Sequence, residues 1–384
     1  MTLIIVLLAV AVVLVSWAAL YLYRRTQADP ERQDPKSYIE GLQALVRGHD
    51  EAAFGKLRET VNADTSNIDA YIQLGNIFRR RKKPDLALQV HRDLTFRGSL
   101  TLEQKKEILS ALFHDFIESG DEAAAVRAIN EILELSPNDR FALTALLLHH
   151  EKSGDWKEAA VVRRRLDKLD GHDSGRMLAL YKVFEGYDLA AQGDRHRARL
   201  FYKEAIHLDK SCLAAYIAIG DSYYDENRLE DAIGYWTKVI TINPCEGHLV
   251  FERLKKGFFE VGRYGDYADT LTTLLQSCPE HLTARLELAY FMEKKGEFDA
   301  SREHYTTALD NHPNSLLAKL GLYRLHLETN RRESAAGLLK QTIRMAVKRE
   351  ASNFRCSECG LRSETMTWLC PRCKAVDSFA AELS

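Results

Sequence analysis

The chain has 384 residues, of which 46% are hydrophobic and 28% are charged, so a packed globular protein is expected and extended disorder is excluded. Its formal net charge is only −2, so the chain has no overall basic field of the kind that favours nucleic acid. Seven cysteines are too few for a disulfide scaffold of this length, and this number favours a reducing compartment.

The N-terminal residues 2–23 form an uncharged run, TLIIVLLAVAVVLVSWAALYLY. At about 1.5 Å per residue, a helix of this length spans roughly 33 Å, which is enough to cross a bilayer. Arg24 and Arg25 follow the run and no basic side chain precedes it, which favours an uncleaved anchor with a cytoplasmic body over a cleaved signal peptide and a periplasmic scaffold. We therefore predict a single-pass inner-membrane anchor over residues 1–25 and a polar linker over residues 26–37.

A period of about 34 residues fills the middle of the chain, from residue 38 to residue 348. It is clearest at residues 213–246, where small side chains at Gly220 and Ala232 would let two antiparallel helices approach, Trp236 would fill the space beside them and Pro244 would end the second helix. The repeats start near residues 34, 68, 106, 140, 179, 213, 248, 282 and 316. This pattern predicts an all-α tetratricopeptide-repeat superhelix of about nine units.

Such a superhelix has a concave groove that is normally lined by the first helix of each repeat. The run Arg79–Lys83, RRRKK, is either a site for an acidic peptide or anionic lipid head groups, or a solvated helix end. The other groove candidates are equally open to the alternative of solvated or inter-repeat packing residues. The candidate groove residues are Asn76, Arg79, Arg80, Tyr187, Asp221, Tyr224 and Tyr290.

Two C-x-x-C pairs lie near the C-terminus, Cys356 with Cys359 and Cys370 with Cys373, separated by ten residues. Each pair places two thiolates on one tight turn, and two facing turns would form a tetrahedral four-sulfur site. The alternatives are disulfides or free thiols. We predict one divalent metal ion, with zinc preferred over iron, in a rubredoxin-like or zinc-ribbon module over residues 349–384. A closed site of this kind leaves no position for water, so the metal is expected to fold the module and not to catalyse a reaction.

The surroundings of these cysteines carry further expectations. Gly360 follows the first pair, whereas Lys374 takes the corresponding place after the second. Trp368 is expected to cover the site, and the module is expected to cap the last repeats, near Tyr323 to Leu339. The remaining cysteines fall near repeat junctions and are expected to be packing residues. They are Cys212, Cys245 and Cys278.

Motifs of the common enzyme classes are absent from the sequence: it contains no G-x-x-x-x-G-K-[ST], G-x-G-x-x-G, H-E-x-x-H or G-x-S-x-G. Its many acidic residues are expected on the solvated faces of amphipathic helices. We therefore predict a protein that is not an enzyme.

The order of these modules resembles the lipopolysaccharide assembly protein B family of Gram-negative bacteria. The resemblance covers the whole chain and depends on the start LIIVLLAVAVVLVSWAALYLYRR, the stretch LGNIFRRRKKPDLALQVHRDL at 74–94 and the tail FRCSECGLRSETMTWLCPRCKAVDSF at 354–379. It implies that Cys356, Cys359, Cys370 and Cys373 are the metal ligands. It also implies an essential adaptor that presents the deacetylase committing precursor to lipid A synthesis to the membrane protease FtsH, and that contacts an inner-membrane lipopolysaccharide sensor through its anchor.

Two other functions remain open at this point. In the first, the cysteine pairs hold iron and the protein passes electrons as a rubredoxin does. In the second, the chain is a general membrane-bound scaffold for envelope assembly. A homodimer is compatible with any of the three.

Overall fold

The computed structural model describes residues 35–98, 100–346, 354–363 and 365–381. The predicted anchor, residues 1–25, lies outside these ranges, as do most of the predicted linker and residues 347–353. Within the described ranges, no helix combines the length and the apolar character that crossing a membrane requires.

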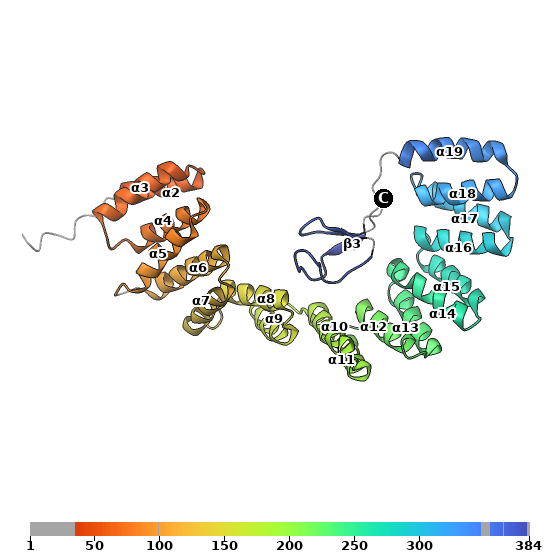
Figure 1. Cartoon of the computed structure of the whole chain (residues 1–384), viewed down its shortest axis with the longest axis horizontal. Coiled ribbons are helices and arrows are strands. Elements are labelled where there is room, and N and C mark those ends of the chain that lie inside the picture. Colours follow the sequence, from red (N-terminus) through yellow and green to blue (C-terminus); the bar gives the residue numbers. More distant parts are fainter. Residues whose placement is uncertain (1–34, 99, 347–353, 364, 382–384) are drawn as a thin grey trace, which may run out of the picture. The chain divides into compact units, whose positions relative to one another are not determined.

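Eighteen α-helices occupy residues 35–346 and follow one another as nine consecutive pairs, as the 34-residue period predicts (Figure 1). The all-α repeat fold is therefore confirmed. In chain order the helices are α2 Pro35–Val46, α3 Asp50–Ala63, α4 Ile68–Arg80, α5 Pro84–Thr95, α6 Leu102–Ser119, α7 Glu122–Leu135, α8 Arg140–Ser153, α9 Trp156–Asp170, α10 Gly175–Ala191, α11 Arg195–Leu208, α12 Leu213–Tyr224, α13 Leu229–Ile242, α14 Phe251–Glu260, α15 Tyr264–Ser277, α16 Leu282–Lys295, α17 Phe298–Asn311, α18 Leu316–Glu328 and α19 Arg332–Ala346, with a 3₁₀ helix, η1 Pro244–Val250, before α14.

Side-chain caps and left-handed residues set the ends of several helices. Thr101 accepts a hydrogen bond from the backbone N–H of Gln104 while the Gln104 side chain accepts one from Thr101, which is a complete capping box at the start of α6. The same helix ends at Gly120, whose φ of 81° is left-handed and favours glycine. These signals are local, which is why the repeat boundaries can be read from the sequence.

Close contact between the two helices of a pair depends on small residues opposite rings, as expected for Gly220. A Cβ at Gly220 would lie 2.4 Å from Nε1 of Trp236, and a Cβ at Gly75 would lie 2.3 Å from Nε2 of His91. Both rings are at least 98% buried. Substitution of either glycine by a larger residue would therefore force the helix pair apart.

The chain divides into two compact units, Met1–Ala145 and Leu146–Ser384. A core cluster of the first unit is formed by α3 and α4 around Leu57 and Ile77. The main cluster of the second unit runs from α12 to α16 and includes Trp236, Leu254 and Leu271. In each unit the core lies between helices of successive repeats, as a stack of helix pairs requires.

The described residues of 354–381, here called the ribbon, contain the strands of the described chain (Figure 1). Three short strands, β1 Phe354–Cys356, β2 Arg362–Ser363 and β3 Phe379–Ala381, form an antiparallel sheet in the order β2-β1-β3. Cys356 pairs with Phe379 and Arg355 with Arg362 in this sheet. The sheet holds the first cysteine turn in place, and the second turn lies between β2 and β3 in the sequence.

Candidate metal centre

The two cysteine pairs have the same backbone geometry. The N–H of Gly360 donates to the carbonyl of Cys356 and the N–H of Lys374 donates to the carbonyl of Cys370, each at 2.9 Å. Gly360 has a φ of 67° and Lys374 a φ of 60°, so the second turn forces a lysine into the left-handed region that the first turn gives to glycine. The equivalence of Gly360 and Lys374 that the sequence suggests is therefore observed.

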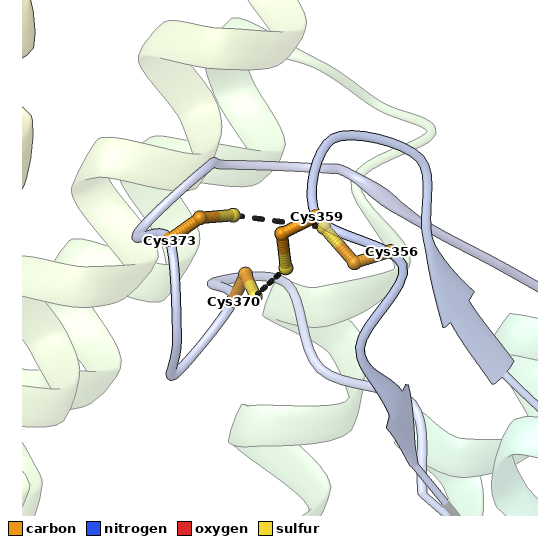
Figure 2. Close-up of side chains that lie close together, drawn as sticks. All are labelled: Cys356, Cys359, Cys370 and Cys373. Carbon is orange, nitrogen blue, oxygen red and sulfur yellow. Dashed lines mark hydrogen bonds between the residues drawn. The ribbon is translucent and has the colours of Figure 1, made fainter.

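The four sulfur atoms lie together, as Figure 2 shows, with all of them within 4.8 Å of one another. The Sγ atoms of Cys356 and Cys373 are 3.7 Å apart, and those of Cys359 and Cys370 are 3.6 Å apart. A tetrahedron with metal–sulfur bonds of about 2.3 Å has an edge of about 3.8 Å. Both distances are too long for a disulfide, whose bond is about 2.05 Å, and both are close to the edge of a four-thiolate metal site.

The protonation of these thiols is uneven. Burial opposes ionisation of Cys356, but the Ser378 hydroxyl and nearby backbone N–H groups hold its pKa at about 6. Cys373 is stabilised as a thiolate by the N–H of Ala375, yet burial and the three neighbouring sulfurs raise its pKa to about 12. Four adjacent sulfurs therefore do not all ionise without a cation between them, and a divalent metal would supply that charge.

Apolar side chains shield one side of the centre. Phe354 and Phe379 pack with the buried Cys356 and Cys370, and Leu361 and Met366 are half-buried against this cluster. Trp368 was expected to cover the sulfurs, but it packs against the main helical core of the second unit, so that expectation is wrong. The indole stabilises docking of the ribbon on the helices. The side chains of the ribbon cluster, such as Phe354 and Met366, shield the sulfurs instead.

The ribbon docks on α10 and η1. The prediction that it caps the last repeats, near Tyr323 to Leu339, is therefore wrong. The Arg176 guanidinium donates to both carboxylate oxygens of Asp377, at 2.5 and 2.7 Å. The ring of His248 stacks on Phe354 with centroids 6.1 Å apart. Proximity in the sequence had suggested the last helices, but seven intervening residues can span up to about 25 Å and leave the choice of contact to complementary side chains.

Leu249 completes this contact, because it packs against the apolar cluster of the ribbon. Burial lowers the pKa of His248, so its ring meets Phe354 as a neutral imidazole at neutral pH. The hydrogen bonds to Asp377 raise the pKa of Arg176. Sequence reasoning missed these contact residues, since a half-buried leucine or an exposed arginine on a repeat has no local signature.

The basic run at the end of α4 is paired within the first unit. Arg79 donates to the buried Asp115 at 2.7 Å and to Asn76 at 2.7 Å. Arg80 makes two hydrogen bonds to Asp50, at 2.9 and 3.1 Å. The same Asp115 lies 2.5 Å from Nδ1 of His91. Arg79 and Arg80 thus join helices of neighbouring repeats, and Asn76 holds Arg79 within α4. This corresponds to the packing alternative and leaves less charge for a lipid or peptide.

The groove candidates of the second unit also make contacts between helices. Asp221 accepts from Trp236 at 3.0 Å and from Arg253 at 2.7 and 3.0 Å. The hydroxyl of Tyr224 donates to Glu260 at 2.6 Å.

Two exposed tyrosines complete the set. Tyr187 lies between the rings of Phe184 and Tyr202. Tyr290 is 38% exposed and has the guanidinium of Arg324 at 4.8 Å and the ammonium of Lys294 at 5.2 Å from its centroid. Of the predicted groove residues in this unit, Tyr290 thus combines an exposed ring with nearby cations.

The scattered cysteines differ from one another. Cys212 is buried at the start of α12, and burial raises the pKa of its thiol to about 11. Cys278 is half-buried, and a hydrogen bond with the thiol of Cys245 raises its pKa, also to about 11. Cys245 is exposed, so the expectation that all three are packing residues is wrong for this one.

Comparison with known proteins matches both modules. The rubredoxin metal binding domain family matches residues 354–381, and the tetratricopeptide repeat family matches residues 185–244 and 293–346. Lipopolysaccharide assembly protein B of Escherichia coli strain K12 is 27% identical over 366 residues, which cover 92% of both chains. The chain is therefore a homologue of lipopolysaccharide assembly protein B over nearly its whole length.

A second member of the lipopolysaccharide assembly protein B family, from Haemophilus influenzae, is 23% identical over 368 residues, covering 92% of this chain and 91% of that one. Among solved structures, the tetratricopeptide-repeat protein YrrB aligns with 44% of this chain and 87% of its own, with a TM-score of 0.32 and 18% identity. The similarity to these relatives thus extends through both modules. The four-sulfur site lies in the part of the chain that matches the rubredoxin metal binding domain.

Proposed function

We propose that this chain is a non-enzymatic adaptor on the cytoplasmic face of the inner membrane, and that it limits lipopolysaccharide synthesis. It would hold the deacetylase that commits precursor to lipid A synthesis and present it to the membrane protease FtsH for degradation. Residues 1–25 would anchor the chain and contact an inner-membrane lipopolysaccharide sensor. Stacked repeats are typical of proteins that bind other proteins over an extended surface, which suits an adaptor.

The observation that carries this proposal is the docked four-sulfur ribbon. Its four sulfurs lie within 4.8 Å of one another, and a metal bound by all four would have no open position for water or substrate. The ribbon also contacts the repeats through Asp377 and Phe354, and Leu249 of η1 packs against it, which suits a part that shapes a binding surface. Relatives named lipopolysaccharide assembly protein B along nearly the whole chain indicate the pathway.

Depletion of the chain in its own organism tests the proposal. The deacetylase half-life, measured by blocking translation and following the protein with time, should lengthen several-fold, and lipopolysaccharide should rise. Restoring the full chain should restore the short half-life. An unchanged half-life after depletion would count decisively against the proposal, whatever happens to lipopolysaccharide.

Metal content separates the adaptor from the rubredoxin-type alternative, which is favoured by the family that matches residues 354–381. Elemental analysis and an absorption spectrum of the full chain purified from membranes should give one zinc ion and a colourless protein. One iron with the visible absorption of ferric thiolate, together with reversible reduction, would instead support electron transfer.

A further inference from the structure

Three leucines form an exposed apolar stripe on α18. Leu317 is 68% exposed, Leu320 is 42% exposed and Leu327 is 49% exposed. Spacings of three and seven residues place them on one side of the helix, and Arg324, which is half-exposed, lies between Leu320 and Leu327 on that side. We call these four residues the α18 face. A cluster of leucines left in water is costly and marks a surface that another molecule covers.

The repeat period relates this face to the surface that the ribbon covers. Leu317 follows Leu249 by 68 residues, which is twice the repeat, and Arg324 follows Tyr290 by 34 residues. Leu249 packs against the apolar cluster of the ribbon, which contains Phe354 and Phe379. The molecule therefore shows what covers this repeat position elsewhere: a folded polypeptide segment that presents aromatic side chains.

Charge next to the stripe defines the partner further. Arg324 is bound to the buried Glu293 at 2.5 and 2.8 Å and lies over Tyr290, which also faces Lys294. Among the described residues no carboxylate pairs with Lys294, whereas on the ribbon side Arg176 is met by Asp377. A partner that matches both features presents apolar side chains about one helical turn apart, flanked by a carboxylate.

We propose that the α18 face, with Tyr290 and Lys294 at its edge, binds an amphipathic segment of the partner protein that carries such a carboxylate. This inference rests on the proposed function, in which that partner is the deacetylase. A bilayer is the weaker candidate, because lipid-binding surfaces gather several unpaired cations around the apolar residues and this face offers few. A second copy would bring the two Lys294 ammonium groups toward one another and is also disfavoured.

The experiment uses the full chain, solubilised from membranes with its anchor, and the purified deacetylase. Replacing Leu320 by Asp should weaken the measured affinity by about tenfold or more, as truncation of an interface centre does, while Leu320→Met should stay within about threefold of the wild type. The matched control is Leu200→Asp, since Leu200 is 48% exposed on α11, seven helices before α18 in the chain. It should bind within about twofold of the wild type.

The charge is tested separately by Lys294→Glu, which should weaken binding by a few-fold and reduce its dependence on salt. Circular dichroism melting of each variant shows that the repeats still fold. If the wild type binds and Leu320→Asp binds equally well, the inference is overturned and the adaptor function stands. If the wild type does not bind the deacetylase, this result contradicts both the inference and the proposed adaptor function. If Leu320→Asp only dissociates a homodimer, the face is a self-interface and the inference is wrong.

Discussion

Removal of the Trp368 side chain tests how firmly the ribbon is held on the repeats. The indole is half-buried against the core cluster that runs from α12 to α16. A buried Trp side chain covers roughly 200 Å² of surface, and with about half of it against the helices, at about 25 cal/mol per Å², the contact stabilises docking by about 2.5 kcal/mol. Trp368→Ala should therefore shift the docking equilibrium toward the free ribbon by about seventyfold.

Hydrogen exchange of the full chain, followed by mass spectrometry, measures this shift. Backbone amides of η1, Pro244–Val250, should exchange faster in Trp368→Ala because Leu249 and His248 lose their cover. The matched control is Phe259→Ala, since Phe259 is a 72% exposed aromatic residue of α14 in the same unit. Exchange in η1 that stays at the wild-type rate in Trp368→Ala, or that rises equally in Phe259→Ala, would refute this account of docking.

Three further predictions concern single side chains. Lys374→Gly should raise the resistance of the metal centre to a chelator, by about 1 kcal/mol, because glycine adopts the left-handed φ of 60° without strain. Faster loss of the metal to the chelator than in the wild type would contradict this. Burial lowers the pKa of His281 to about 4. Between about pH 6.5 and pH 4 the unfolded chain therefore protonates this imidazole while the folded chain does not. The free energy of unfolding falls as the pH falls through that window, by about 2 kcal/mol from pH 7 to pH 5. His281→Asn, which can still cap α16 through the N–H of Ala284, should flatten this slope in urea unfolding; an unchanged slope would place the effect elsewhere. In alkylation followed by mass spectrometry, exposed Cys245 should react well before buried Cys212, whose pKa is raised to about 11, and the reverse order would contradict the burial argument.

Local and periodic features of the sequence predicted most of the fold. The 34-residue period depends on small residues opposite rings, such as Gly220 and Trp236, and those contacts lie within one helix pair. The four metal-ligating candidates were equally accessible, because each C-x-x-C turn is a local unit.

The docking site of the ribbon was not predictable in this way. It depends on Arg176 meeting Asp377, residues 201 positions apart, and on Leu249 meeting the ribbon cluster. Neither pairing leaves a trace in spacing or composition. The role of Trp368 was missed for the same reason, since proximity to Cys370 in the sequence suggested a lid and the tertiary contact gave an anchor.

The charged run of α4 shows a different limit. Its density suggested a binding surface, but the acids that pair with it, Asp50, Glu51, Asp115 and Glu118, come from neighbouring helices. Repeats place such helices side by side, so the charge of one helix says little until its neighbours are known.

Reconstitution tests the central claim, that this chain is an adaptor for regulated proteolysis. FtsH in proteoliposomes would be mixed with the deacetylase, with the full chain or with its Cys356→Ser variant, and degradation of the deacetylase would be followed with time. We expect rapid degradation with the wild-type chain and slow degradation both without it and with Cys356→Ser, which lacks one metal ligand. Equal degradation with and without the chain would contradict the account.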